Sequence, residues 1–124
     1  EVVKLNMLEE QSTVSKRRTG TGSSPNFIHS LDAAAMTKTI NQCRGYSMND
    51  FAMVHDSYGT HSSAMPTMSN IIREEFVKMY EEHDVLMELR HHAIQLLGTR
   101  DIPLPPAMGD LDIRNVLHSE YFFA

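Results

Sequence analysis

A short β-rich stretch, Phe51 to Thr60, interrupts a chain whose other apolar residues recur at helical spacing, and it therefore limits the fold classes that remain open. Its apolar residues lead directly to His55 and Asp56, and Gly59 follows as a residue that lets the chain turn back. This order predicts a strand that delivers the Asp56 carboxylate to a turn. A carboxylate in that position can bind a hard cation such as Mg²⁺, but an Asp at a strand end more commonly forms a turn or caps a helix. Local chemistry alone favours the turn former.

Apolar residues at spacings of three and four predict three helices, at residues 26–43, 64–82 and 84–97. Ser24 is expected as the N-cap of the first helix, with Pro25 at its first helical position. The second helix carries a Met-rich stripe, which is typical of a packed core and not of a cofactor site: Met65, Met68, Ile72, Phe76 and Met79. With the predicted strand, these helices indicate an α+β fold in which a small antiparallel hairpin sheet is packed by several α-helices.

Both ends of the chain carry further predicted segments. Residues 2–8 have the β-branched and apolar content of a strand, and a loop rich in turn formers follows to residue 24. The basic cluster at residues 16–18 is either a solvated part of that loop or a contact for a phosphate backbone. A short last helix is expected at residues 109–117. The aromatic residues 121–123 are unusual for a loose tail, so we expect them to dock, either as part of the core or in a functional role.

The chain has 124 residues with 41% hydrophobic composition, which is enough for one domain with a core. Its one cysteine, Cys43, excludes an intrachain disulfide and is typical of a protein from a reducing compartment. No apolar run reaches the roughly 20 residues of a membrane-spanning helix, and we expect no membrane partner. The net charge of −5 argues against an autonomous nucleic-acid-binding module, because such modules draw affinity from phosphate neutralisation. The first residues lack both an initiating Met and a signal-peptide pattern, which suggests an internal cut before residue 1.

Three blocks of sequence carry a family resemblance. They run from Pro25 to Asp32, from His55 to Thr60, and from Pro106 to Ala124. In this order they resemble the C-terminal part of the single-subunit DNA-directed RNA polymerases of bacteriophages, to which the mitochondrial RNA polymerases are related. The second block is similar to the third palm motif of that family. The resemblance divides the chain into residues 1–24, a loosely matched strand and flexible loop, and residues 25–124, a C-terminal palm segment.

The resemblance implies template-directed nucleotidyl transfer from NTPs to the 3′ end of RNA during transcription. Asp56 would be a catalytic residue, one of the two palm aspartates that hold Mg²⁺ for two-metal catalysis. His55 would help position the primer end or the turn, and His29 resembles a histidine that touches the RNA–DNA hybrid. Phe123 and Ala124 would fold back toward the active site. The partners implied are a DNA template, nascent RNA, NTPs and the remaining polymerase domains.

Two expectations concern the source and completeness of the chain. The Tyr58-Gly59-Thr60 segment resembles the phage form of the motif, which predicts a phage-encoded protein in the cytoplasm of an infected bacterium, with the mitochondrion as the alternative. The family's other metal aspartate and its NTP-binding residues lie upstream of the segment that resembles this chain. We therefore expect a fragment that does not polymerise on its own.

Two other functional classes remain open on sequence alone. The first is a metal phosphohydrolase of the type named for its His-Asp pair, since the chain has seven histidines and the dipeptide His55-Asp56. Those enzymes carry the pair on a helix, whereas here the pair is expected at the end of a strand. The second is a non-catalytic helical interaction module, for which the two predicted helices at residues 64–82 and 84–97, each with apolar residues along one side, would suffice.

Overall fold

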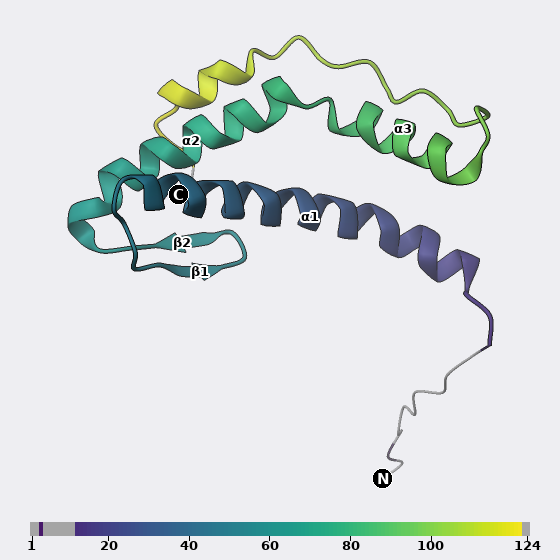
Figure 1. Ribbon diagram of the computed structural model, residues 1–124, viewed down its shortest axis with the longest axis horizontal. Helices are drawn as coiled ribbons and strands as arrows, with labels where there is room; N and C mark the ends of the chain where they lie inside the picture. The colour runs from purple at the N-terminus through teal and green to yellow at the C-terminus, as the bar shows by residue number, and fades with distance from the viewer. Residues whose placement is uncertain (1–2, 4–11, 123–124) are drawn as a thin grey trace. The chain divides into compact units, whose positions relative to one another are not determined.

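The computed structural model describes Val3 and residues 12–122, which are rich in helix and contain a two-stranded antiparallel sheet (Figure 1). The elements in chain order are α1 (Lys16–Gly45), β1 (Ala52–Val54), β2 (Ser57–Gly59), η1 (Ser62–Ala64), α2 (Met65–Glu82), α3 (Val85–Leu97) and η2 (Ile113–His118). The predicted α+β class is confirmed. The strand predicted at residues 2–8 lies, apart from Val3, outside the described residues.

Residues 1–31 and 32–124 are two separate compact units. In the first unit, α1 begins at Lys16, although a loop was predicted there. Ser15 takes the capping position predicted for Ser24: its Oγ accepts a hydrogen bond from the backbone N–H of Arg18 at 3.4 Å. The prediction of a flexible loop up to residue 24 was therefore wrong from Lys16 onward.

Side-chain hydroxyls explain how a segment rich in turn formers becomes helical. The Oγ1 of Thr21 donates to the Arg17 carbonyl at 3.0 Å, and the Oγ of Ser23 donates to the Thr19 carbonyl at 2.7 Å. Hydroxyls that bond to carbonyls one turn back no longer compete with the helix for backbone groups. Pro25, predicted at the first helical position, lies inside α1, where it removes one backbone donor.

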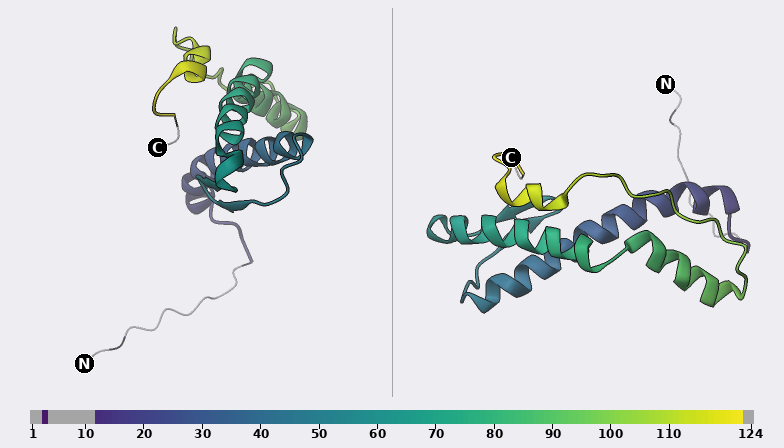
Figure 2. Two further views of the ribbon diagram at one scale, coloured as in Figure 1. Left: turned by 90° about the vertical axis from the view of Figure 1, so that its left-hand side faces the viewer. Right: turned by 90° about the horizontal axis from the view of Figure 1, so that it is seen from above.

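In the second unit, β1 and β2 form a tight hairpin with the pairs Ala52–Gly59, Met53–Tyr58 and Val54–Ser57. The hairpin lies beside the C-terminal end of α1 and the first turns of α2 (Figures 1 and 2). The core beneath it consists of buried residues from the end of α1, the following turn and α2: Cys43, Met48, Met68, Ile71 and Ile72. Residues from the hairpin pack against this cluster, which anchors the turn that carries Asp56.

Helix α2 confirms the helix predicted at residues 64–82. Its Met-rich stripe enters the core at Met68, Ile72 and Met79, as expected, but Met65 remains 42% exposed. The buried face is wider than the predicted stripe, because neighbouring positions such as Ile71 are buried as well.

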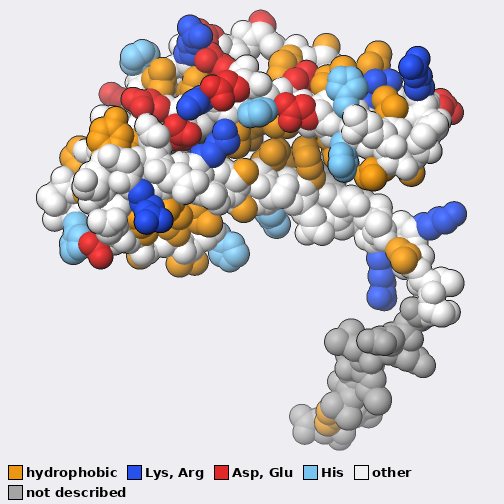
Figure 3. Space-filling view, in the orientation of Figure 1, with side chains coloured by type: hydrophobic (Ala, Val, Ile, Leu, Met, Phe, Trp, Pro, Cys, Tyr) orange, Lys and Arg blue, Asp and Glu red, His pale blue; other side chains and the backbone are white. Residues whose placement is uncertain are grey.

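Helix α3 confirms the helix predicted at residues 84–97. The Oδ1 of Asp84 accepts from the Met87 N–H at 3.1 Å at its start, and Gly98 ends it with φ +63°. None of its residues is buried, and its apolar side chains reach the surface (Figure 3). The chain then returns to α2, where η2 packs beside that helix (Figures 1 and 2). The short last helix predicted at residues 109–117 is the 3₁₀ helix η2, which begins later, at Ile113.

No helix among the described residues is long and apolar enough to span a bilayer.

Candidate active site at the β1–β2 hairpin

His55 and Asp56 form the two-residue turn of the hairpin, between the paired residues Val54 and Ser57. The predicted delivery of Asp56 to a turn after a strand is confirmed. His55 has φ +53°, a left-handed conformation that is uncommon outside glycine and that hairpin turns of this length require at their first position. The bend therefore depends on His55 and not on Gly59.

Gly59 lies within β2, opposite Ala52. A Cβ added at Gly59 would lie 3.2 Å from the Ala52 carbonyl oxygen, closer than a side chain ordinarily approaches a backbone atom. The close pairing of the two strands accounts for this glycine, which the sequence analysis had interpreted as the residue that reverses the chain.

Asp56 lines a cavity of about 270 Å³ between the hairpin, α2 and the C-terminal segment. Polar residues of β2 and α2 also line this cavity, among them Ser57, Ser69 and Arg73. Apolar walls come from α2 and from Phe122. An exposed carboxylate beside a guanidinium and hydroxyls can share an oxygen-binding cation and a phosphate group.

A second cavity of about 170 Å³ is lined by Asp56 and His55 together with Asp32 of α1 and the aromatic side chains of Tyr58 and Tyr80. Phe122 lines this cavity too, so the same residue forms part of the wall of both cavities that Asp56 lines.

The pKa values of the two tyrosines that line this second cavity are both raised. Burial raises the pKa of Tyr58 above its ordinary value of 10.0, and the negative charges of Asp32 and Asp56 raise it further. Burial also raises the pKa of Tyr80, with a smaller contribution from Asp32. Both phenols therefore remain protonated, as hydrogen-bond donors, throughout the physiological pH range.

The free energy of unfolding is expected to fall as the pH rises above 10.0, the ordinary pKa of Tyr58. Tyrosine in the unfolded chain ionises at a lower pH than Tyr58 in the folded chain. Above pH 10.0 the unfolded state therefore binds fewer protons than the folded state, and a further rise in pH lowers the free energy of unfolding. Urea unfolding between pH 8 and 11 should show this decline, and Tyr58→Phe should make it shallower. Tyr121→Phe is the matched control, because Tyr121 is 80% exposed. Equal pH dependence in Tyr58→Phe and the unchanged chain would contradict the assignment.

The structure places the remaining predicted site residues as follows. His29 lies on the exposed surface of α1, in the unit formed by residues 1–31, and its proposed contact with nucleic acid stays a prediction. Phe123 and Ala124 lie outside the described residues, but their neighbour Phe122 is docked: its ring packs edge to face on Phe76 with centroids 4.9 Å apart. The expectation that the terminal aromatics dock is confirmed for Phe122, while Tyr121 is exposed.

Several residues of the site were missed by the sequence analysis. Tyr58 and Tyr80 were not predicted as site residues, and Asp32 was named as the last residue of the block from Pro25 to Asp32. Arg73 gave one weak signal, a basic residue directly beside the core residue Ile72 in a Met-rich helix. Helical spacing places Arg73 at the edge of the buried face of this helix, but it does not identify the segment of the chain that packs against that edge.

The donor set beside the hairpin offers a single exposed carboxylate, Asp56, to a cation. Among the residues that the structure describes, no three His, Cys, Asp or Glu side chains are grouped to hold a metal ion. The exposed Asp56 carboxylate fits a hard cation that takes one or two protein carboxylates and completes its shell with phosphate and water oxygens. The His-Asp phosphohydrolase alternative requires the pair on a helix, and here the pair occupies a hairpin turn.

Comparisons with known proteins agree with the resemblance. A family model described as DNA-dependent RNA polymerase matches residues 1–101. The chain is 41% identical over 119 residues to "DNA-directed RNA polymerase 2B, chloroplastic/mitochondrial" of Nicotiana tabacum, which covers 96% of this chain and 12% of that protein. It is 40% identical to "DNA-directed RNA polymerase 1A" of the same plant, over 96% of this chain and 76% of that protein. No solved structure matches the chain.

These relatives correct the expected source. "DNA-directed RNA polymerase 1, mitochondrial" of Arabidopsis thaliana is 40% identical over 96% of this chain and 12% of its own length. With similar relatives named as chloroplastic or mitochondrial, the prediction of a phage protein in the cytoplasm of a bacterial host was wrong. That prediction depended on the segment that contains Gly59, and the close approach of the Ala52 carbonyl gives this glycine a local structural reason that does not depend on the source.

The chain spans about 12% of the length of the tobacco 2B enzyme and of the Arabidopsis enzyme. The family model nevertheless matches most of the chain, including the hairpin that carries Asp56. The chain belongs to the family of single-subunit DNA-dependent RNA polymerases.

Proposed function

We propose that the chain is the C-terminal catalytic segment of a DNA-directed RNA polymerase that transfers nucleotides from NTPs to the 3′ end of RNA. The observation that carries this proposal is the position of Asp56, an exposed carboxylate at the tip of a two-residue hairpin, in a chain of the polymerase family. The turn places Asp56 in the lining of two cavities, to which residues with cationic and hydroxyl side chains also contribute.

Asp56 is the residue that would hold Mg²⁺ in this site. When bound, the metal supplies charge neutralisation and activation of oxygen at the reacting phosphate. The side chain is short and attached to a turn anchored by paired strands, so little conformational freedom is lost when it binds a cation. His55, directly before it, is exposed and available to the RNA 3′ end, and His29 would contact the RNA–DNA hybrid. Phe123 and Ala124 complete the proposed site.

The proposed partners are a DNA template, nascent RNA, NTPs and the remaining polymerase domains. The chain has a net charge of −5, so most of the basic surface that holds nucleic acid is assigned to the remaining polymerase domains. The family resemblance assigns Asp56 as one of two metal-binding aspartates, and it places the other upstream of the segment that this chain matches. We therefore propose that the isolated chain is inactive.

The names of the plant relatives support an organellar location, with the mitochondrion as the proposed compartment.

A segment exchange tests the function. The matching 119 residues of tobacco RNA polymerase 2B are replaced by this chain, and primer extension is measured with Mg²⁺ and four NTPs. We expect product from the exchanged enzyme and none from the isolated chain or from the tobacco enzyme with the segment deleted. An exchanged enzyme that binds a DNA–RNA scaffold but makes no product would overturn the proposal. Product from the isolated chain would refute its proposed dependence on other domains.

A further inference from the structure

Arg73, in the middle of α2, contacts two separate parts of the C-terminal segment. Its Nη1 donates a hydrogen bond to the Val116 carbonyl of η2 at 2.7 Å, in a partly buried position. Its guanidinium carbon lies 5.6 Å from the centre of the Phe122 ring, within the range of a cation–π interaction. One side chain therefore joins α2 both to η2 and to the aromatic residue that follows it.

Phe122 is the part of the C-terminal segment that reaches the site. Its ring packs against Phe76, and it lines both cavities that Asp56 lines. The guanidinium of Arg73 lies over the same ring, and Arg73 also lines the larger cavity. The position of this ring therefore determines the shape of the space beside the Asp56 carboxylate.

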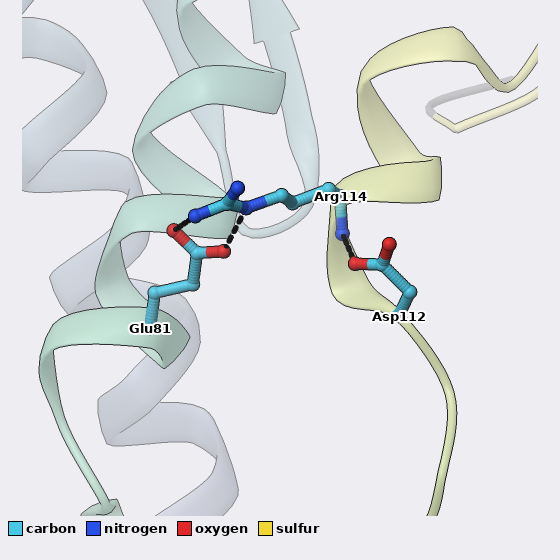
Figure 4. Close-up of polar contacts among 3 residues, drawn as sticks. All are labelled: Glu81, Asp112 and Arg114. Carbon is cyan, nitrogen blue, oxygen red and sulfur yellow. Dashed lines mark hydrogen bonds and ion pairs between the residues drawn. The ribbon is translucent and has the colours of Figure 1, made fainter.

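A second contact holds the beginning of η2 (Figure 4). Arg114 donates from Nε and Nη2 to the two carboxylate oxygens of Glu81 in α2, and its backbone N–H donates to Asp112 Oδ1 at 2.9 Å. Figure 3 shows acidic and basic side chains intermixed over this part of the surface. The Arg114 side chain is 68% exposed, so solvent and salt weaken this ion pair. The partly buried contact made by Arg73 is therefore the stronger determinant of where the segment lies.

We propose that Arg73 is a positioning residue for nucleotide transfer: by holding η2 and Phe122 against α2, it keeps the Phe122 ring as a wall of the site beside Asp56. The inference rests on the proposed function. Its structural part, that Arg73 holds the Phe122 ring in place, can be tested without an activity assay. Arginine suits the role because a single guanidinium can donate to a carbonyl and lie over an aromatic face at the same time.

The structural half is tested with a fluorescent reporter at position 122. The chain contains no tryptophan, so Phe122→Trp introduces a unique emission signal. In this background, Arg73→Gln should shift the emission to longer wavelength and raise acrylamide quenching about two- to threefold, because the ring loses its cationic partner and η2 loses an anchor. Arg73→Lys should restore much of the protection, since lysine keeps a cation and a donor.

Arg90 provides a matched control. Its Nε donates to the carbonyls of Ile102 and Pro103 at 3.0 and 3.2 Å, so it also fixes a chain segment to a helix, but these hydrogen bonds involve neither η2 nor Phe122. Arg90→Gln should leave the emission of the reporter unchanged. Quenching that is the same in Arg73→Gln and in its parent would overturn the inference. Labelling the five phenylalanines with 4-fluorophenylalanine gives the same test at native ring size, with the Phe122 signal assigned by its loss in Phe122→Leu.

The functional half is tested in the segment-exchanged polymerase. Arg73→Gln should lower the rate of nucleotide addition at saturating NTP by about tenfold, because misplacement of groups around a reacting centre acts on the chemical step. Arg73→Lys should recover most of that rate, and Arg90→Gln should have no effect. A released Phe122 ring with an unchanged rate would overturn the positioning role alone. The proposed function fails separately, if the exchanged enzyme without any Arg73 substitution is inactive.

Discussion

Replacing Asp56 with Asn in the segment-exchanged polymerase is expected to lower the rate of nucleotide addition by about 10³-fold or more. Loss of a single group that stabilises developing charge already costs about 10²- to 10³-fold in other enzymes. The amide keeps the size of the side chain and its place in the hairpin turn, but it removes the charge on which cation binding depends. Single-nucleotide addition to an annealed RNA primer, measured at several Mg²⁺ concentrations, gives the rate.

The matched control for this variant is Asp110→Asn. It removes the same charge from an exposed carboxylate in the segment between α3 and η2, and the rate should stay within about twofold of the parent rate. Asp56→Glu keeps the charge but displaces it by one methylene, so it should be nearly as slow as Asp56→Asn. A rate for Asp56→Asn within about threefold of the parent would remove Asp56 from the proposed chemistry.

The largest expected effect on stability comes from Met68→Ala. The Met68 side chain is 0% exposed and lies in the cluster on which the hairpin packs. Large-to-small substitutions of this kind cost about 2–5 kcal/mol in the free energy of unfolding, because burial is lost and a cavity remains. Such a loss is a large fraction of the total stability of an ordinary domain. Urea unfolding followed by circular dichroism measures the difference.

Two control variants provide values for the change in the free energy of unfolding with which Met68→Ala can be compared. Met108→Ala removes the same atoms from a side chain that is 74% exposed, and it should change the free energy of unfolding by less than about 0.5 kcal/mol. Met68→Leu keeps most of the volume and should cost less than about 1.5 kcal/mol. If Met68→Ala were as stable as Met108→Ala, the cluster described beneath the hairpin would not be the core of this unit.

Much of the local structure could be predicted from residue order. The spacing of apolar residues located α2 and α3 closely, and the run that ends in His55-Asp56 located the hairpin turn. The start of α1 was missed because serine and threonine hydroxyls can bond either to the local backbone of a loop or to helix carbonyls one turn back. Residue order does not say which of the two is adopted.

The site was predicted only in part. The formation of a strand and the turn after it depends on residues close together in the sequence, so the position of Asp56 in a turn was predictable. The side chains around Asp56 come from segments far apart in the sequence: Asp32 from α1, Arg73 from α2 and Phe122 from the C-terminal segment. Their approach depends on how these segments pack, and periodicity identifies a buried face without identifying what covers it.

The sequence by itself therefore determined the helices α2 and α3, the delivery of Asp56 to a turn and the membership of the polymerase family, because each depends on short-range order. Only the tertiary structure decided that His55, with its positive φ, makes the bend and that Gly59 makes room for Ala52. It also decided that Arg73 lies over the Phe122 ring, which lines the two cavities beside the carboxylate. The physical reason is that strand pairing and side-chain packing select among conformations that remain comparable in energy for an isolated segment.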